Sequence, residues 1–345
     1  MRVLVDISHP AHFHFFKYVI EAWRQRGHQV TIASRDKDIT LELLDAAKEN
    51  HYPLSTARRG VFGLGVELLE HESALYRLVK EHKPDVLLQV GGTFIVHVGR
   101  LTGTKSIVFY DTENATVSNF ITYPFADAIC TPASYKGDIG AKHVRYDGFQ
   151  ELAYLHPNWF VPDKSVLDRV GVEDGNPFSL VRFVGWDSGH DVNLNGFSRR
   201  GKEQLISELA ALGKVFISSE GSLPLSLQNY ELDLPKSEIH HLMAFANLCV
   251  GESATMASEA AILGTPAVFL SPVGRGYTDE QEQKYGLVYN YDAQSEDEAI
   301  SRAVELFADT EIKKKWLPKR EMLLADKIDV TAWMVDFVEE FVKKP

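Results

Sequence analysis

Apolar residues along the first part of the chain fall into two alternating patterns. Residues 3–7 are apolar except for Asp6, and the next segment repeats apolar side chains every three or four positions, at Phe13, Phe16, Ile20 and Trp23. The first pattern predicts a buried strand and the second an amphipathic helix. The same alternation predicts strands at residues 28–33, 85–90, 106–110 and 128–130, and helices at 39–48, 66–79 and 94–101. Strands that alternate with helices in this way predict a parallel sheet.

The alternation begins again after a proline-rich segment. Residues 151–165 contain Pro157 and Pro162 and are expected to connect two domains. Ser295 and Glu298 have the spacing of a capping box for a helix that would end at Phe307. The rest of the pattern predicts strands at residues 180–184, 215–218, 248–250, 267–270 and 287–291, and helices at 205–212, 240–245, 255–263 and 330–342.

We therefore expect an α/β protein with two Rossmann-like, doubly wound parallel-sheet domains. The pattern places the first domain at residues 1–155, the second at 160–325 and a C-terminal helix within 326–345. A chain of 345 residues is longer than most single cores, which agrees with two domains. In folds of this kind, ligands bind at the carboxyl ends of the strands.

Composition excludes several classes of partner. The net charge of −12 argues against a nucleic-acid partner, because an acidic surface repels phosphates. No apolar stretch reaches the roughly 18 residues of a membrane span, and Asp6 interrupts the first apolar run, so neither an integral membrane segment nor a signal peptide is expected. Cys130 and Cys249 lie far apart in apolar surroundings, as free buried thiols do. These features predict a cytoplasmic protein.

The segment from Gly251 to Thr255 is the strongest candidate for a binding site. It reads Gly-Glu-Ser-Ala-Thr, follows a predicted strand and opens a predicted helix. Its small side chains would let a phosphate approach the free N–H groups of the helix N-terminus, where the helix dipole favours negative charge. We predict that Gly251, Ser253, Ala254 and Thr255 bind a diphosphate. Glu259, one turn further, is placed to accept hydrogen bonds from a ribose diol, although an ordinary capped helix with a surface glutamate has the same pattern.

This segment resembles the nucleotide-binding stretch of the GT-B superfamily, which includes glycosyltransferases and non-hydrolysing UDP-N-acetylglucosamine 2-epimerases. In those epimerases a Ser-Gly-Gly-x-x-Glu-Glu-Ala pattern binds the diphosphate and ribose. Ser253, Glu259 and Ala260 keep its spacing, whereas Ala254-Thr255 replaces the double glycine. The whole chain is also similar to the GT-B relatives grouped as domain of unknown function 354. The resemblance implies a nucleotide-sugar donor on the second domain, an acceptor on the first, a central cleft between them, and a C-terminal helix that packs back on the first domain.

The resemblance extends to two further segments of the second half. In GT-B enzymes an acidic residue and a glutamine after the next strand often touch hydroxyls of the donor sugar, and Asp279 and Gln281 occupy that place. A solvated polar helix is the alternative there. The epimerases carry a functional histidine after the first strand of this domain, where His190 aligns in type and Asp191 replaces an arginine. Arg182, on the strand itself, is expected to pair with a phosphate or with a nearby aspartate.

Three positions of the first half are candidates for the same cleft. Glu113 matches the place of a glutamate in the epimerases, and His9 follows the first strand, where many GT-B chains have a loop that touches acceptor or donor. Gly91 is expected to form a tight turn that lines the cleft. Glu113, His190 and His9 are therefore the candidate acids or bases. His12 is expected to be a surface residue of the first helix.

No metal site and no cofactor are predicted. Asp36-Lys37-Asp38 matches a metal-binding Asp-x-Asp only in its letters, because it opens a helix, where acidic residues complement the dipole. The nucleoside diphosphate sugar would be the substrate.

Three functions remain open from the sequence. A glycosyltransferase would move the sugar, from UDP or another nucleotide, to a glycan or lipid-linked acceptor in polysaccharide or glycoconjugate synthesis. A nucleotide-sugar 2-epimerase would use an acid and a base across the same cleft, and a non-catalytic protein would only bind the nucleotide sugar. The departures at Ala254-Thr255 and Asp191 from the epimerase pattern favour the transferase. A homodimer is compatible with each function.

Overall fold

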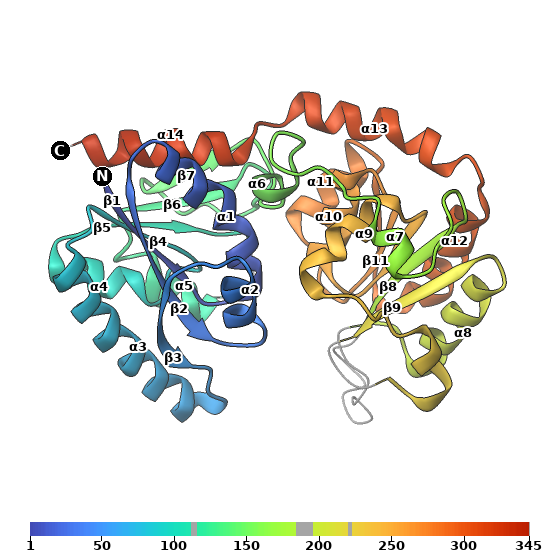
Figure 1. Ribbon diagram of the computed structural model, residues 1–345, viewed down its shortest axis with the longest axis horizontal. Coiled ribbons are helices and arrows are strands. Elements are labelled where there is room, and N and C mark those ends of the chain that lie inside the picture. The colour runs from blue at the N-terminus through green and yellow to red at the C-terminus, as the bar shows by residue number, and fades with distance from the viewer. Residues whose placement is uncertain (112–115, 184–195, 220–222, 345) are drawn as a thin grey trace. The chain divides into compact units, whose positions relative to one another are not determined.

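The computed structural model describes residues 1–111, 116–183, 196–219 and 223–344 (Figure 1). Contacts divide the chain into two compact units. The first unit comprises Met1–Tyr154 and Ile328–Pro345, and the second comprises Leu155–Lys327. The C-terminal segment is therefore part of the first unit, although the second unit precedes it in the chain.

The first unit is built on a seven-stranded sheet in the order β3-β2-β1-β4-β5-β6-β7, and its neighbouring strands run parallel. Leu4 and Val5 point to opposite faces of β1 and are both fully buried, because helices cover the two faces. The strands are β1 (Arg2–Ile7), β2 (Gln29–Asp36), β3 (His51–Thr56), β4 (Val86–Val90), β5 (Lys105–Phe109), β6 (Ala128–Pro132) and β7 (His143–Tyr146).

Helices α1, α2 and α14 pack together in this unit, and α3 packs on α4 (Figure 1). The C-terminal helix α14 is held on α1 by apolar contacts and by charge, since Arg26 Nη1 lies 2.8 Å from Asp336 Oδ1 and 3.0 Å from Glu339 Oε1. The helices of the first unit are α1 (Pro10–Gln25), α2 (Thr40–Ala46), α3 (Gly60–His82), α4 (Ile95–Thr102), α5 (Thr116–Thr122), α6 (Leu152–Leu155) and α14 (Val330–Lys343).

The second unit is built on a five-stranded parallel sheet in the order β12-β11-β10-β8-β9. Its strands are β8 (Phe178–Phe183), β9 (Lys214–Ser219), β10 (Leu248–Gly251), β11 (Ala267–Leu270) and β12 (Val288–Tyr291). Its helices are α7 (Val166–Arg169), α8 (Arg199–Ala210), α9 (Ile239–Phe245), α10 (Ala254–Leu263), α11 (Gly276–Gln283), α12 (Glu296–Ala308) and α13 (Ile312–Asp326), and its 3₁₀ segments are η1 (Leu225–Tyr230), η2 (Lys236–Glu238) and η3 (Ala293–Ser295). Two Rossmann-like parallel sheets with flanking helices confirm the predicted fold class.

The strand order reverses once in each sheet. In the first sheet the reversal lies between β1 and β4, and in the second it lies between β8 and β10. Helices that leave two adjacent strands in opposite directions open a crevice at the carboxyl ends of those strands, where ligands of doubly wound sheets bind. The segments that follow β1, β4 and β10 are therefore the places to look for a site.

Some elements differ from the sequence-based expectation. Strands β3 and β7 were not predicted, and both are edge strands whose side chains are largely exposed or half-buried, so they lack the apolar run of a central strand. Helix α13 carries the basic residues 313–315 and 319–320, for which the sequence favours a solvated surface helix. It contains Pro318, and its basic residues donate to carbonyl groups of the second unit, with Lys313 Nζ 3.0 Å from the oxygens of Ala244 and Ala246. Burial lowers the pKa of Lys313 to about 8.

The predicted capping box is wrong. Ser295 makes no side-chain cap, and the chain enters α12 through η3, where Asp292 Oδ1 accepts from Gln294 N at 2.9 Å and from Ser295 N at 3.1 Å. The acidic residue that matters is Glu296, whose carboxylate accepts from the hydroxyl of Ser198 at 2.8 Å. Spacing alone could not distinguish these carboxylates, because three acidic residues occupy the first turn of α12.

Gly251 is required by the close approach of β10 to β8. It lies opposite Arg182 in the sheet, and a Cβ at this position would be 2.2 Å from the Arg182 carbonyl oxygen. We expect Gly251→Ala to lower the free energy of unfolding by about 1–3 kcal/mol or more, because backbone has to move. Gly65→Ala in α3 is the matched control. A Cβ there meets nothing within 4 Å, so this change should be neutral or stabilising by up to about 1 kcal/mol. Equal urea midpoints for wild type and Gly251→Ala would contradict the constraint.

Candidate functional site

The loop between β10 and α10 ends in an open helix start. Ser253 is the N-cap residue of α10, with extended backbone, and its hydroxyl accepts from Met256 N at 3.3 Å. Within the described part of the chain, no acceptor contacts the N–H groups of Ser253, Ala254 or Thr255. Three donors at the positive end of a ten-residue helix are therefore free for an anion.

A buried ion pair neutralises the acidic residue of this loop. Glu252 immediately precedes the open helix start, and its charge would oppose an anion bound there. Lys202 Nζ lies 3.0 Å from Glu252 Oε1, and both side chains are almost fully buried. The same oxygen accepts from Phe197 N at 2.9 Å. Lys202 comes from α8, about fifty residues earlier in the chain, so no motif spacing could have predicted this pairing.

A hollow of about 270 Å³ lies beside the loop, at the carboxyl ends of β8 and β9. Arg182 forms part of its wall and donates through Nη1 to Ser218 Oγ at 2.9 Å. A mixture of apolar wall and a few polar groups suits a flat ring with polar edges. Sequence reasoning did not select the apolar lining, which comes from β9, α10 and the segment around η2: Ile217, Leu232, Leu234, Pro235, Ile239 and Met256.

Glu259 is not the surface residue that a simple capped helix would carry. It is only 5% exposed, and its Oε1 lies 2.9 Å from His240 Nε2. His240 comes from α9 and is 4% exposed, so the pair is buried and its geometry is set by the packing of α9 on α10. Sequence reasoning placed His240 in a helix and missed this contact, because nineteen residues separate the two partners. A contact of Glu259 with a ribose stays a prediction.

The two residues predicted on α11 have different positions. Gln281 is fully buried, and its amide donates to Ser258 Oγ at 2.7 Å, which joins α11 to α10. Because it is buried, Gln281 contributes to the packing of α11 on α10, and little of its side chain is accessible to a sugar. Asp279 is half-buried in the first turn of α11, where a carboxylate suits the helix dipole. Its contact with a donor sugar stays a prediction.

In the first unit, His9 and Gly91 follow the two strands at the switch point. His9 caps α1, with its Nδ1 accepting from Ala11 N at 3.2 Å and its Nε2 3.9 Å from Asp38 Oδ2. Burial, followed by the charge of Lys37, lowers the pKa of His9 to about 4 although Asp38 opposes the change. Gly91 has a φ of +82° and donates to Phe109 O at 2.9 Å, as expected for a tight turn.

A buried polar cluster lies under this edge of the first sheet. His71 from α3 is fully buried and stacks on Phe94, with ring centroids 4.0 Å apart. Its Nε2 lies 2.9 Å from Asp6 Oδ2, and its Nδ1 lies 2.7 Å from Ser55 Oγ. Asp6, on β1, is also fully buried, and the histidine contacts its Oδ2 only, because Oδ1 has no hydrogen-bond partner among the described residues.

Hydrogen bonds connect this cluster to His12 through Gln89 and Ser8. Gln89, on β4, lies with its Nε2 3.0 Å from Asp6 Oδ2 and 3.2 Å from Ser8 Oγ. Ser8 Oγ in turn lies 3.3 Å from His12 Nδ1. His12 was expected to be a surface residue, and this expectation is wrong, because the ring is partly buried and bound to Ser8. Burial, followed by His9 and Lys37, lowers the pKa of His12 to about 3.

The remaining predicted residues lie outside the described residues. Glu113, His190 and Asp191 fall within 112–115 and 184–195. Their roles stay predictions. Among the described candidates, the structure brings Gly251, Ser253, Ala254, Thr255, Glu259 and Arg182 together in the second unit, and His9 and Gly91 together in the first.

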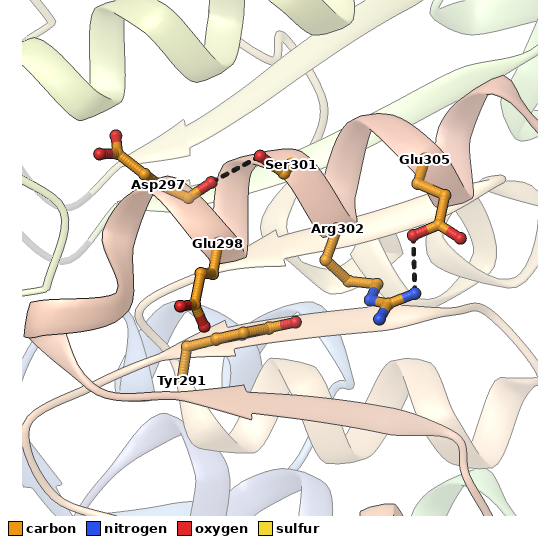
Figure 2. Close-up of a pocket in the computed structure, with 6 residues that line it drawn as sticks. All are labelled: Tyr291, Asp297, Glu298, Ser301, Arg302 and Glu305. Atoms are coloured by element: carbon orange, nitrogen blue, oxygen red, sulfur yellow. Dashed lines mark hydrogen bonds and ion pairs between the residues drawn. The ribbon is translucent and has the colours of Figure 1, made fainter.

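A larger hollow, of about 380 Å³, lies on the outer face of α12 at the end of β12 (Figure 2). Three carboxylates and one guanidinium line it, from Asp297, Glu298, Glu305 and Arg302. Arg302 Nη1 donates to Glu305 Oε2 at 2.7 Å. The excess of negative charge makes this hollow unsuitable for a phosphate, which leaves the smaller hollow beside Ser253 as the better candidate.

Neither a membrane-spanning helix nor a metal site is present in the described residues. No helix among them is long and apolar enough to cross a membrane. Within the same residues, no group of three or more His, Cys, Asp or Glu side chains has an arrangement that could hold a metal ion.

Solved structures with this fold include glycosyltransferases and sugar epimerases. The chain is similar to spinosyn forosaminyltransferase, at 14% identity and a TM-score of 0.66, with 100% of both chains covered. It is also similar to the UDP-GlcNAc 2-epimerase from Neisseria meningitidis bound to UDP-GlcNAc, at 13% identity and a TM-score of 0.70, again over 100% of both chains. These similarities confirm the expected GT-B fold, and at such identities they concern the fold alone.

Comparison with related sequences identifies the family of this chain. An uncharacterized protein from Methanocaldococcus jannaschii is 22% identical over 285 residues, which cover 79% of this chain and 82% of that protein. Residues 1–343 match the family described as "Protein of unknown function (DUF354)". Because the match runs over nearly the whole length, the chain belongs to the DUF354 family.

Proposed function

We propose that this protein is a glycosyltransferase of the GT-B type, which moves a sugar from a nucleoside diphosphate to an acceptor in polysaccharide or glycoconjugate synthesis. One observation carries the proposal: the open N–H groups of Ser253, Ala254 and Thr255 adjoin a hollow with a largely apolar wall, at the switch point of the second sheet. An anion site next to a site for a flat ring is the combination that a nucleotide requires.

In the proposed complex each part of the donor has its own partner. The diphosphate takes the N–H groups at the start of α10, with Arg182, which lines the adjoining hollow, as the candidate cation. The base occupies the hollow, and the ribose hydroxyls donate to Glu259, which His240 orients. The same N–H groups would stabilise the diphosphate as it leaves, because its charge increases when the bond to the sugar breaks. Glu113 and His190 remain the candidates for the base.

The second candidate is a nucleotide-sugar 2-epimerase. The similarity to the Neisseria meningitidis epimerase favours it, since that structure holds UDP-GlcNAc on the same fold. The absence of the double glycine, which this chain replaces with Ala254-Thr255, favours the transferase.

A panel of nucleotide sugars separates the candidates. We expect release of nucleoside diphosphate that depends on an added acceptor, measured by coupled detection of the free nucleotide. Conversion of the sugar without any acceptor would identify the epimerase instead. Binding of a nucleotide sugar by calorimetry, without either reaction across the panel, would identify a non-catalytic binding protein and refute the proposal.

Removal of one N–H donor tests the diphosphate site. We expect Thr255→Pro to weaken binding of the nucleoside diphosphate by about 1–3 kcal/mol, because proline lacks the N–H group and is tolerated in the first turn of a helix. Thr255→Ala is the matched control, since it keeps the N–H group and should bind normally. EDTA should leave affinity unchanged, and loss of binding in EDTA that magnesium restores would show that a metal holds the diphosphate.

Glu259→Gln tests the ribose contact. We expect affinity for the nucleotide to fall by about 1–3 kcal/mol, the usual cost of weakening a hydrogen bond to a charged group. The free energy of unfolding should also fall, because the buried pair with His240 loses its charge. Glu298→Gln, on the exposed face of α12, controls for the change in net charge. Equal affinities of wild type and Glu259→Gln in calorimetry would rule out the ribose contact.

A further inference from the structure

We propose that His9 and His12 are hydrogen-bond donors for an anionic oxygen group of the acceptor and not bases, and that Gln89 is a positioning residue that sets this state of His12. The assignment of the anion to an acceptor rests on the proposed function. The state of the two rings does not, because it follows from the hydrogen bonds around them.

The amide orientation of Gln89 is determined by a backbone group. Phe94 N lies 3.2 Å from Oε1 of Gln89, and a backbone N–H group can only donate. The oxygen of the amide therefore faces Phe94, and the nitrogen faces Asp6 Oδ2 and Ser8 Oγ. An amide nitrogen can only donate as well, so Ser8 Oγ accepts from Gln89.

The hydroxyl hydrogen of Ser8 then has one place to go. Among the described residues, the polar side-chain atoms in contact with Ser8 Oγ are Gln89 Nε2 and His12 Nδ1. Ser8 is only 6% exposed, and a buried hydroxyl hydrogen without an acceptor costs about 1–3 kcal/mol. Ser8 therefore donates to Nδ1 of His12, and the ring proton of the neutral imidazole resides on Nε2.

His9 reaches the same state through a different donor. The N–H group of Ala11 lies 3.2 Å from Nδ1 of His9, and this group can only donate. The ring proton of His9 is therefore on Nε2 too. Burial and the ammonium of Lys37 lower the pKa of both rings, so both are neutral near pH 7. In each ring the lone pair that could take a proton is already occupied by a donor.

The surroundings of the two Nε2–H groups favour an anionic oxygen. The ring centroids are 5.7 Å apart, and in the proposed site one group with several oxygens accepts from both Nε2–H groups. Lys37 is close enough to affect both rings, whereas the nearby Arg35 is already paired with Glu67. His9 Nε2 lies 3.9 Å from the exposed carboxylate of Asp38, which is beyond hydrogen-bond range. A phosphate or a carboxylate on the acceptor fits these donors and this cation.

Nitrogen–proton correlation spectra of the full chain with ¹⁵N-labelled histidine report the ring state directly. In wild type at pH 7 we expect neutral Nε2–H rings for both His9 and His12. Gln89→Glu gives the Ser8 hydroxyl a second acceptor, so the His12 proton should move towards Nδ1 while His9 stays unchanged. Ser8→Ala is the second variant should Gln89→Glu fail to fold: it removes the hydrogen bond that holds the proton on Nε2, so the His12 ring should lose its exclusive Nε2–H state and populate both tautomers. If Gln89 and Ser8 only supported the fold, neither substitution would change the tautomer of His12.

Binding of the anion is tested with inorganic phosphate. Added phosphate should shift the Nε2–H signals of both rings with saturation, and sodium chloride at equal ionic strength should not. Lys37→Met should weaken the phosphate affinity about tenfold. A nucleoside diphosphate alone should leave both rings unshifted. The donor role would be overturned by an Nδ1–H or doubly protonated ring in wild type, or by Nε2–H signals that do not shift when phosphate is added. Signals that shift with the nucleoside diphosphate would overturn the assignment of the anion to the acceptor.

These outcomes are separate from those of the proposed function. The ring states and the phosphate titration use no nucleotide sugar, and loss of nucleotide binding in Thr255→Pro concerns the second unit alone. A protein that fails the nucleotide-sugar panel but shows Nε2–H rings that bind phosphate would keep the anion site and lose the transferase.

Discussion

A parallel sheet collects the carboxyl ends of all its strands at one edge, and that constraint shapes both units of this protein. At the edge, backbone leaves the ladder of hydrogen bonds and its polar groups need other partners. In the second unit Gly251 lets β10 approach the Arg182 carbonyl, so that the chain turns directly into α10 with three N–H groups open. In the first unit the turn after β1 is closed by His9, whose ring accepts from the helix start.

Three buried carboxylates near these edges each have a nitrogen partner among the described residues. Glu252 is paired with Lys202, Glu259 with His240, and Asp6 with His71 and Gln89. Breaking a buried pair by removal of one partner costs about 3–5 kcal/mol, so such pairs restrict which side chains the edge tolerates. The pairing also removes negative charge from the surface that a phosphate would approach. At the proposed anion site, the carboxylate next to the open donors of the second unit is already paired with an ammonium group.

The fold could be predicted from the sequence because central strands are short, mainly apolar runs, as at residues 267–270, or at 3–7, where only Asp6 is polar. The edge strands β3 and β7 could not, because apolar and polar residues are mixed along them and neither contains a run of apolar residues. For the site, a local motif was enough to select Ser253 to Thr255, since loop and helix are adjacent in sequence. Lys202, His240 and Gln89 were missed because each meets its partner across at least nineteen residues, and only the folded chain brings them together.

The proposed anion sites at the carboxyl ends of the two sheets use different donors. Neither of them relies on a cluster of exposed cations. The second unit offers backbone N–H groups, and the first offers neutral imidazoles with one ammonium nearby. A chain of net charge −12 would repel an anion at long range, but salt screens that repulsion beyond about 8 Å under physiological conditions. Within that distance the local hydrogen-bond donors determine whether an anion binds. An acidic protein can therefore hold acidic substrates, provided that its donors are fixed by the fold and its own carboxylates are paired.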